Sequence, residues 1–345
     1  MTNVTRSSRR ISPFRLSILI IVVVGIAFAG YASVLTDFLW FDQLGFSSVL
    51  ITQVVAQAGM FLAGSISLGG VVGLSLALAY RSRPIYLKFP DQGDPFGVYR
   101  QLIEQLRKGV MIGLPILLGI FGGVAATAKW DVVLAWFNRT YTGQVDPQFG
   151  LDISFYFFDL PFLTSITTYA SATVLIAGLL AAFVHTIFGG IRFNGRRSSI
   201  TKAARIQVSV MAALYLAIQG VSLWLDQYKT MTNASGLYTG ATYADVNAVI
   251  PGFQILAMIA AVVAILFLVA AFIGQWRLPI MATGLMVVSS IILGGLYPWI
   301  VQTFQVGPNE RTLEAVYIDR NIEATRKAYG LDAVENQDYQ AKTDT

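Results

Sequence analysis

The chain has 345 residues, of which 55% are hydrophobic and only 12% are charged, and its mean hydropathy is +0.62. Soluble domains usually carry about a quarter of their residues charged, so this composition excludes an ordinary soluble globule and indicates a membrane protein. The absence of cysteine excludes disulfides and thiol nucleophiles, and the single histidine, His185, excludes a multi-histidine metal site within the chain. The net charge is +5, but the basic residues occupy short segments between apolar runs, which favours membrane orientation over nucleic-acid binding.

Seven apolar runs are each long enough to cross a hydrocarbon core of about 30 Å. They are Leu16–Leu35, a run within Val49–Tyr80, Val110–Thr127, Leu163–Phe188, Val208–Leu225, Ile250–Ile273 and Leu278–Val301. The first run follows a basic head but is too long for the core of a signal peptide, so we expect an uncleaved helix. The predicted fold class is an all-α integral membrane bundle of about seven transmembrane helices.

Basic residues are unequally divided between the segments that join these runs. With the N-terminus inside, the four inner segments hold four, six, five and one basic residues, sixteen in all, whereas the outer loops hold only Lys129, Arg139 and Lys229. Because short cytoplasmic segments are enriched in Lys and Arg, this bias predicts a cytoplasmic N-terminus and an extracytoplasmic C-terminus. We expect a multi-pass protein of the cell (plasma) membrane.

Three shorter segments are expected at the membrane surfaces. Asp37–Phe46 and Trp130–Phe137 mix aromatic and acidic residues and should lie at the outer interface, where Trp and Tyr are enriched. Phe96–Lys108 has apolar residues at helical spacing and should be an amphipathic helix on the inner surface.

Small and polar residues within the runs predict contacts between helices. The pairs Gly69/Gly73 and Gly119/Gly123 favour close helix packing, and Gln53, Gln57, Gln207 and Gln219 favour hydrogen bonds between helices. We interpret His185 as a packed, hydrogen-bonded side chain. None of the seven runs contains a carboxylate, which argues against a proton-coupled or ion-coupled transporter.

The stretch Asp146–Phe162, DPQFGLDISFYFFDLPF, is both acidic and aromatic. Its carboxylates could hold a divalent cation or a cationic ligand, but no EF-hand spacing occurs, and we favour aspartates that cap helices and form turns. Its aromatic rings could line a lipid-binding groove, although an interfacial belt packed on the bundle is the favoured alternative. The candidate ligand or partner surface consists of Asp146, Asp152, Phe155, Tyr156 and Asp159.

The C-terminal stretch Gly307–Leu331 is predicted to be an amphipathic helix, because Ile318, Ile322, Thr325 and Tyr329 share one helical face. Such a helix outside the membrane needs a surface to pack against. We therefore expect a seven-helix membrane domain over residues 1–303 and the start of an extracytoplasmic domain, most of which is missing, over residues 304–345.

Three long motifs carry a resemblance to a known family: WFDQLGF (Trp40–Phe46), the stretch Asp146–Phe162, and PNERTLEAVYIDRNIEATRKAYGL (Pro308–Leu331). With these motifs the chain resembles the uncharacterised protein family (UPF) 0182, large bacterial membrane proteins found notably in actinobacteria. The resemblance implies a bundle of seven helices followed by a large outer domain, and this chain looks like the N-terminal membrane part. It departs from the family pattern at Ala315–Tyr317, where the family has a proline before the tyrosine.

Enzyme motifs are absent: the sequence contains no Walker loop, no HExxH and no GxSxG, so we assign no catalytic residue, metal or cofactor. Three functions stay open. The first is an anchor or assembly component of the cell envelope, and the second is a transporter of lipid or envelope precursors that uses a groove between helices. The third is an enzyme with its active site in the missing outer domain. Expected partners are membrane lipids and envelope proteins or a second copy of the chain, with no nucleic acid.

Overall fold

The structure is a computed structural model that describes residues 13–83, 109–194, 197–234, 238–335 and 337. Within these residues, six helical runs are long and apolar enough to cross a membrane: Ser47–Arg81, Gly109–Thr127, Phe155–Ile187, Lys202–Thr232, Asp245–Ile273 and Arg277–Leu313. The prediction of a helical membrane protein is therefore confirmed. The first predicted run lies within α1 (Pro13–Gln43), which is not among these six. Arg6, Arg9, Arg10, the segment Phe96–Lys108 and Arg196 lie outside the described residues.

The chain divides into two compact units, residues 1–59 and 60–345. The first unit contains α1 and the beginning of α2 (Ser47–Arg81). A short turn joins the two helices: the Phe46 amide donates to the Phe41 carbonyl at 2.9 Å, and the Ser47 hydroxyl donates to Asp42 at 2.9 Å. The expected surface segment Asp37–Phe46 therefore consists mainly of the last turns of α1.

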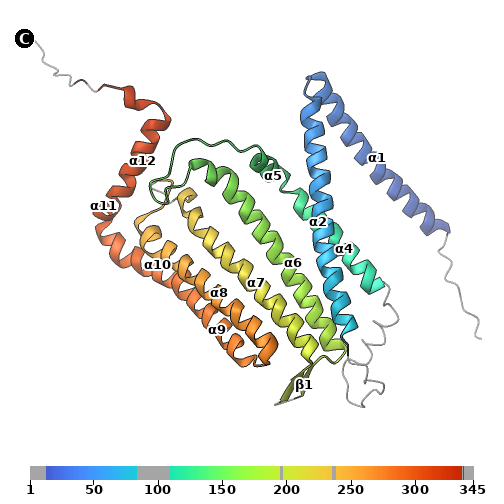
Figure 1. The fold of residues 1–345 in the computed structure, drawn as a ribbon. Coiled ribbons are helices and arrows are strands. Elements are labelled where there is room, and N and C mark those ends of the chain that lie inside the picture. Colours follow the sequence, from blue (N-terminus) through green and yellow to red (C-terminus); the bar gives the residue numbers. More distant parts are fainter. Residues whose placement is uncertain (1–12, 84–108, 195–196, 235–237, 336, 338–345) are drawn as a thin grey trace, which may run out of the picture. The chain divides into compact units, whose positions relative to one another are not determined.

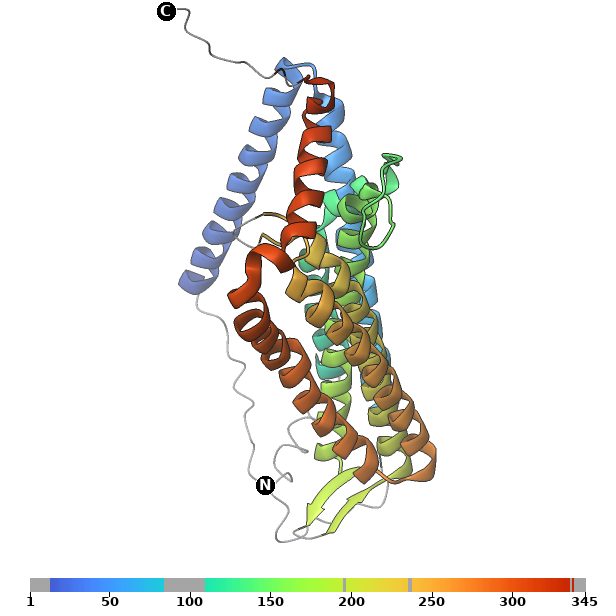
Figure 2. The same ribbon diagram turned by 90° about the vertical axis from the view of Figure 1, so that its left-hand side faces the viewer.

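Four consecutive helices of the second unit run antiparallel to their neighbours. α6 (Leu160–Ile187), α7 (Lys202–Lys229), α8 (Ile250–Ile273) and α9 (Arg277–Ile291) lie side by side in chain order (Figures 1 and 2). A core of buried side chains joins α2 to α6, and its members include Val72, Leu76, Ala177, Ala181 and Val184. Apolar faces that are buried against each other thus alternate with faces that are left for lipid.

Glycines bring α2 into contact with α4 (Leu114–Thr127). A Cβ atom added to Gly119 would lie 2.9 Å from the Ser65 carbonyl oxygen, and one added to Gly69 would lie 2.9 Å from the Pro115 carbonyl oxygen. Gly64, which the sequence pattern did not single out, faces the Gly122 carbonyl in the same way, with 2.6 Å to an added Cβ. The predicted packing role is confirmed for Gly69, Gly119 and Gly123, whereas Gly73 has only ordinary contacts with Pro115. We call this α2–α4 contact the glycine seam.

A hydrogen-bond network around His185 joins α2, α6 and α7. His185 is only 1% exposed. Its Nε2 lies 3.0 Å from Gln207 Oε1, and Gln207 Nε2 donates to the Ser75 carbonyl at 2.8 Å. The Ser75 hydroxyl in turn donates to the Ala177 carbonyl at 2.9 Å. The prediction of a packed, hydrogen-bonded histidine and of a helix-linking Gln207 is confirmed.

Several helices extend well beyond the apolar runs. The π-helical segments η2 (Phe155–Asp159) and η4 (Asp245–Val249) lead into α6 and α8. The last run is continuous from α9 through η5 (Ile292–Leu296), α10 (Tyr297–Ile300), η6 (Val301–Val306) and η7 (Gly307–Asn309) to α11 (Glu310–Leu313). The expected boundary at residue 303 thus falls inside a helical run. Carboxylates such as Asp159 and Asp226 consequently lie in the end turns of candidate spans.

The remaining elements are short. They are η1 (Gly109–Gly113), α5 (Trp130–Phe137), η3 (Thr230–Thr232), α12 (Ala315–Ala328), η8 (Leu331–Ala333) and a hairpin of β1 (Ile191–Asn194) with β2 (Arg197–Ile200). In the hairpin Ile191 pairs with Ile200 and Asn194 with Arg197. The basic segment between α6 and α7 therefore contains two strands.

Candidate functional site: the loop cap

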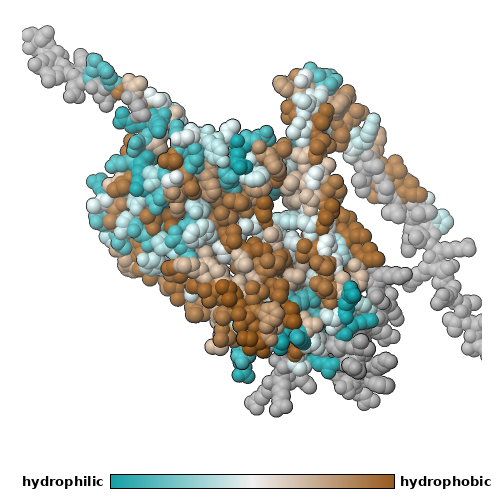
Figure 3. Space-filling view, in the orientation of Figure 1, coloured by the Kyte–Doolittle hydropathy of each residue, from teal (hydrophilic) through white to brown (hydrophobic). Residues whose placement is uncertain are grey.

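Polar segments gather at one end of the second unit, where α7 ends and where α6 and α8 begin (Figures 1 and 2). We call the described residues of 138–159, 230–249 and 307–329 the cap. In Figure 3 hydrophilic surface gathers over α11 and α12, and hydrophobic surface covers α8 and α9. The cap contains all five residues of the predicted ligand or partner surface, so its geometry decides what those residues can do.

Asp146 organises the first cap loop. The residue is 6% exposed, and its carboxylate accepts four hydrogen bonds. Oδ1 receives the amides of Gln148 and Phe149 at 2.8 and 2.7 Å. Oδ2 receives the Leu151 amide at 3.0 Å and the Tyr156 hydroxyl at 2.8 Å. The carboxylate is thus satisfied by its own chain, as expected of a buried anion that a loop folds around.

Asp152 closes the neighbouring turn. Its Oδ1 accepts the amide and hydroxyl of Thr142 at 3.2 and 3.0 Å and the Ser154 amide at 2.8 Å, and its Oδ2 accepts the Gly143 amide at 2.8 Å. Hydrogen bonds from Ser154, and then from Thr142, hold the pKa of this carboxyl well below its ordinary value. Asp152 therefore stays ionised at any physiological pH and serves as a turn-forming group.

Asp159 connects α5 to the start of α6. It accepts a hydrogen bond from the indole Nε1 of Trp136 at 2.9 Å, and Arg139 Nε lies 3.8 Å from the same oxygen. Trp136 also stacks on Phe162 with 4.0 Å between ring centroids and 8° between ring planes. These contacts fix helix α5 against the start of α6.

The aromatic run faces the protein in part. Tyr228, at the end of α7, contacts the ring of Phe149 at 4.8 Å and that of Phe155 at 5.3 Å between centroids. Phe155 also meets Tyr156 at 5.4 Å, edge to face. Phe157, by contrast, is 69% exposed. Two of the rings proposed for a lipid groove are therefore engaged in cap packing, and one points outward.

Glu314 clamps the C-terminal segment to the rest of the cap. The residue is 2% exposed; its Oε2 accepts the Tyr238 hydroxyl at 2.6 Å, and both oxygens lie 3.1–3.2 Å from the Tyr243 amide. Burial, followed by the bond to this carboxylate, raises the pKa of Tyr238, so the phenol keeps its proton. Two bonds from α12 add to the clamp: Arg320 to Gln148 at 3.1 Å and Asn321 to the Thr239 carbonyl at 2.9 Å.

The predicted surface residues divide into three local arrangements. Asp146, Phe155 and Tyr156 come together around one loop, Asp152 holds the adjacent turn, and Asp159 belongs to the α5 contact. No group of three or more His, Asp or Glu side chains that could hold a metal ion occurs among the described residues. The carboxylates bind backbone amides, hydroxyls and an indole, so the chemistry of the cap is that of an assembled structural element.

Sequence reasoning missed Glu314 as a cap residue and Gln227 as a link between helices. Gln227 is 1% exposed and accepts a hydrogen bond from Gln254 of α8 at 2.8 Å. A usable signal existed for Glu314, because it is a lone carboxylate between Leu313 and Ala315–Val316 in an otherwise amphipathic segment. A charged side chain with apolar neighbours on both sides in the sequence is either exposed to water or buried together with a hydrogen-bonding or charged partner.

The comparisons with known proteins identify a family. The profile of the uncharacterised protein family (UPF0182) matches residues 14–345. A UPF0182 protein of Clavibacter michiganensis subsp. michiganensis is 48% identical over 346 residues, which cover 100% of this chain and 35% of that protein. A UPF0182 protein of Arthrobacter sp. is 44% identical over 95% of the chain and 32% of its own length.

No solved structure matches the chain. The chain spans about a third of the length of the curated relatives that it matches. The profile match covers nearly every described element, from α1 through α12 to the last short turn, and the three motifs quoted from the sequence all lie within it. The chain therefore belongs to the uncharacterised protein family UPF0182.

Proposed function

We propose that the chain is a multi-pass anchor of the bacterial plasma membrane, in which α1 is a seventh transmembrane helix. At about 1.5 Å per residue, the 31 residues of α1 exceed the roughly 30 Å of a hydrocarbon core. The excess of basic residues on one side supports a cytoplasmic N-terminus and, with it, a cap outside the cell.

The absence of cysteine makes this topology directly testable. Thr142→Cys in the cap and Ser199→Cys in strand β2 replace exposed residues at opposite ends of the unit. A membrane-impermeant maleimide added to intact cells should label the first variant and spare the second until the cells are opened. Labelling of both cysteines in intact cells would refute the orientation.

We further propose that the helical bundle holds, outside the membrane, a surface on which envelope proteins or further copies of the chain assemble. Residues 304–345 would be the start of an outer domain. The observation that carries this proposal is the Glu314 clamp, which links α11 and α12 to the loop 238–243. A chain segment that only left the membrane would not need a buried carboxylate with three donor contacts, because a flexible tether is satisfied by water. The greater length of the relatives supports an outer part that such a clamp would hold in place.

The test compares Glu314→Gln with Glu323→Gln, an exposed position on α12, the helix that begins directly after Glu314. Losing a charged hydrogen-bonded contact costs about 1.5–3 kcal/mol, so trypsin cleavage after Arg320 should accelerate by about tenfold or more in the first variant only. In mild detergent, envelope proteins or further copies of the chain should co-purify stoichiometrically with the control and be lost from Glu314→Gln. A chain that retains no stoichiometric partner in either variant would refute the assembly role.

A second candidate, transport of a lipid or envelope precursor, is favoured by one observation. A groove of about 570 Å³ runs between α2, α4, α6 and α7, and it is lined mainly by apolar side chains, with Lys129 at one end. Lipid-like density in this groove in a structure determined in native lipid, together with substrate movement in reconstituted vesicles, would favour transport over anchoring. An enzymatic role would instead require catalytic groups in the outer part, so this chain alone would be inert.

A further inference from the structure

A second groove, of different chemistry, lies between α6 and α7. Its volume of about 440 Å³ is within the roughly 300–1,000 Å³ usual for small-molecule sites. It is lined by Thr164, Thr167, Thr168, Ser171, Ala172 and Leu175 of α6 and by Gln219, Ser222, Leu225, Asp226 and Lys229 of α7. Most of these side chains are polar, although both helices are candidate membrane spans. We call this feature the hydroxyl groove.

The polar residues form two stripes that face each other. On α6 they recur at positions 164, 167, 168 and 171, and on α7 at 219, 222, 226 and 229. Steps of three and four residues keep side chains on one face of a helix, so each stripe stays in the groove for about two turns or more. Hydroxyl and amide groups in a membrane span are costly when they face lipid, which makes two matched stripes a functional feature by default.

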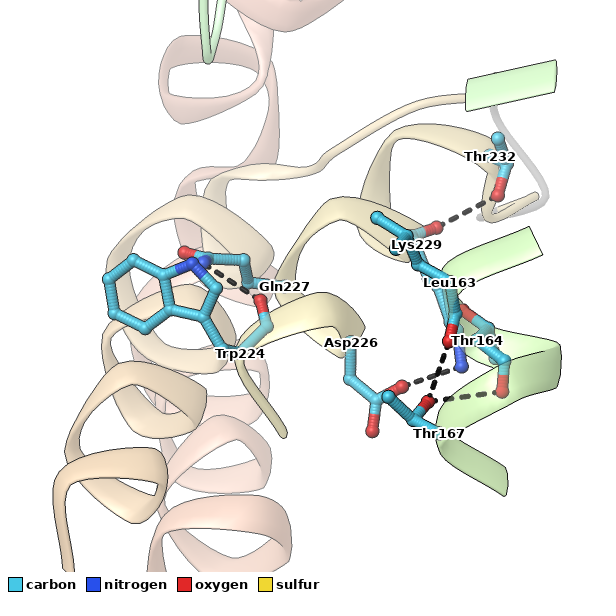
Figure 4. Close-up of polar contacts among 8 residues, drawn as sticks. All are labelled: Leu163, Thr164, Thr167, Trp224, Asp226, Gln227, Lys229 and Thr232. Carbon is cyan, nitrogen blue, oxygen red and sulfur yellow. Dashed lines mark hydrogen bonds and ion pairs between the residues drawn. The ribbon is translucent and has the colours of Figure 1, made fainter. Parts of the chain in front are cut away.

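Several groups that line the groove already have hydrogen-bond partners. Ser171 of α6 donates to Gln219 Oε1 of α7 at 3.2 Å. At the cap end Lys229 Nζ donates to Asp226 Oδ1 at 2.6 Å (Figure 4). Between them, the Thr167 hydroxyl is directed to the carbonyls of Leu163 and Thr164, at 2.9 and 3.1 Å. These groups are thus already satisfied by hydrogen bonds within the protein.

Among the described residues, three further hydroxyls of the groove have no hydrogen-bond partner. Thr164 Oγ1 is buried without a hydrogen bond. Thr168 is exposed and Ser222 is partly buried, and neither makes a side-chain hydrogen bond to another described residue. A hydroxyl that is withdrawn from water costs free energy unless it is bonded. The unsatisfied groups lie on both walls, so one occupant of the groove could satisfy all three.

We propose that the hydroxyl groove binds the sugar headgroup of a membrane lipid. Each free hydroxyl can both donate and accept, which matches an uncharged polyhydroxyl group. Asp226 and Lys229 neutralise each other, so the groove offers no net charge for a phosphate or an ammonium group. The polar stripes pass into Ala172 and Leu175 on α6, which suits a headgroup attached to a hydrocarbon chain. This proposal does not depend on the anchoring role.

The experiment measures lipid retention by native mass spectrometry. The full chain is purified in a polyoxyethylene detergent, which has no sugar, and is exposed separately to diglucosyldiacylglycerol, to diacylglycerol with the same acyl chains, and to phosphatidylglycerol. The diglucosyl lipid should be retained about tenfold better than either comparator. Equal retention of the three lipids would overturn the proposal, because the groove would then hold only water or unspecific lipid.

Variants locate the binding. Thr168→Val combined with Ser222→Ala removes two free hydroxyls without adding bulk and should abolish the preference for the diglucosyl lipid. Thr186→Val is the matched control, since its hydroxyl donates to the Ala182 carbonyl on the same helix outside the groove. Loss of the preference in the control, or its survival in the double variant, would contradict the assignment. Displacement of the lipid by free maltose would support the sugar chemistry but refute a lipid-borne source.

Discussion

The glycine seam and the cap hold the second unit together by opposite means. In the seam, α2 and α4 approach so closely that a Cβ atom on Gly119 would lie 2.9 Å from a carbonyl oxygen of the other helix. In the cap, Asp146 and Glu314 are buried carboxylates that collect donors from surrounding loops. The seam packs because its glycines have no side chains, whereas the cap is held together by the side chains of a few carboxylates.

The difference follows from the two solvents. Lipid does not drive helices together, because hydrocarbon tails are as apolar as the helix surface, so close contact between small residues supplies the attraction. Loops near water have many backbone amides and few apolar groups, and a buried anion can order them because charged hydrogen bonds are about twice as strong as neutral ones. Substitutions should therefore fail for different reasons in the two regions.

The largest effect is expected from Asp146→Ala. It leaves three amides and the Tyr156 hydroxyl without their acceptor in a site that is nearly closed to water. We expect a loss of about 3 kcal/mol in the free energy of unfolding. Thermal unfolding in detergent, followed by tryptophan fluorescence, measures it. Asp131→Ala, which removes an exposed carboxylate on α5, is the control. Equal melting of the two variants would show that the carboxylate does not order the loop.

The seam should respond to added volume. Gly119→Ala forces a methyl group against the Ser65 carbonyl and should destabilise the protein by about 1–3 kcal/mol, as overpacking does elsewhere. Gly70→Ala lies on the facing helix α2 but has no atom within 4 Å of the added Cβ, so it should be neutral or slightly stabilising. If both variants unfold alike in the same melting assay, helix propensity and not contact governs the seam.

The same contrast explains what could be predicted from the sequence. Runs of apolar residues identified the membrane helices, and the spacing of Gly119 and Gly123 identified half of the seam, because both signals are local. The helix ends were missed, since the fourth run was expected from Leu163 and the helix begins at Phe155. Polar and aromatic residues continue the helix there because cap contacts stabilise it.

Contacts between segments that are far apart in the sequence could not be predicted from local sequence patterns. Glu314 meets Tyr238 and Tyr243 across 71–76 residues, and no spacing rule connects such positions. Asp146 and Asp152 accept hydrogen bonds from the amides of their own turns, whereas Asp159 accepts from the Trp136 indole, and no spacing in the sequence indicated these partners. The hairpin had only a weak signal in the sequence: Ile191 and Phe193 alternate before Gly195, but Asn194 itself lies in β1, paired with Arg197, and β2 contains two serines.

A smaller effect is expected where the cap meets α7. Tyr228 lies between Phe149 and Phe155, and Tyr228→Leu preserves an apolar side chain while it removes two edge-to-face ring contacts. Aromatic pairs contribute about 0.5–1.5 kcal/mol beyond their buried area, so we expect a loss of about 1 kcal/mol. Tyr141→Leu, in an exposed ring of the same cap loop, should change nothing measurable. A loss as large as that of Asp146→Ala would mean that rings and not carboxylates order the cap.

The smallest effect concerns pH at Asp152. Its pKa in the folded protein lies below the ordinary value of 3.8, so the turn binds fewer protons than the unfolded chain does in the acid range. The stabilisation is therefore complete above that ordinary value and is lost only as the pH falls toward the lowered pKa. Hydrogen exchange of the Gly143 amide, which donates to Asp152, should show the same protection factor at about pH 7 and about pH 5. Asp152→Asn should lower this protection at both pH values, because a neutral amide is a weaker acceptor. Protection that disappears between these two values would require a raised pKa and would remove Asp152 from the set of carboxylates that order the cap.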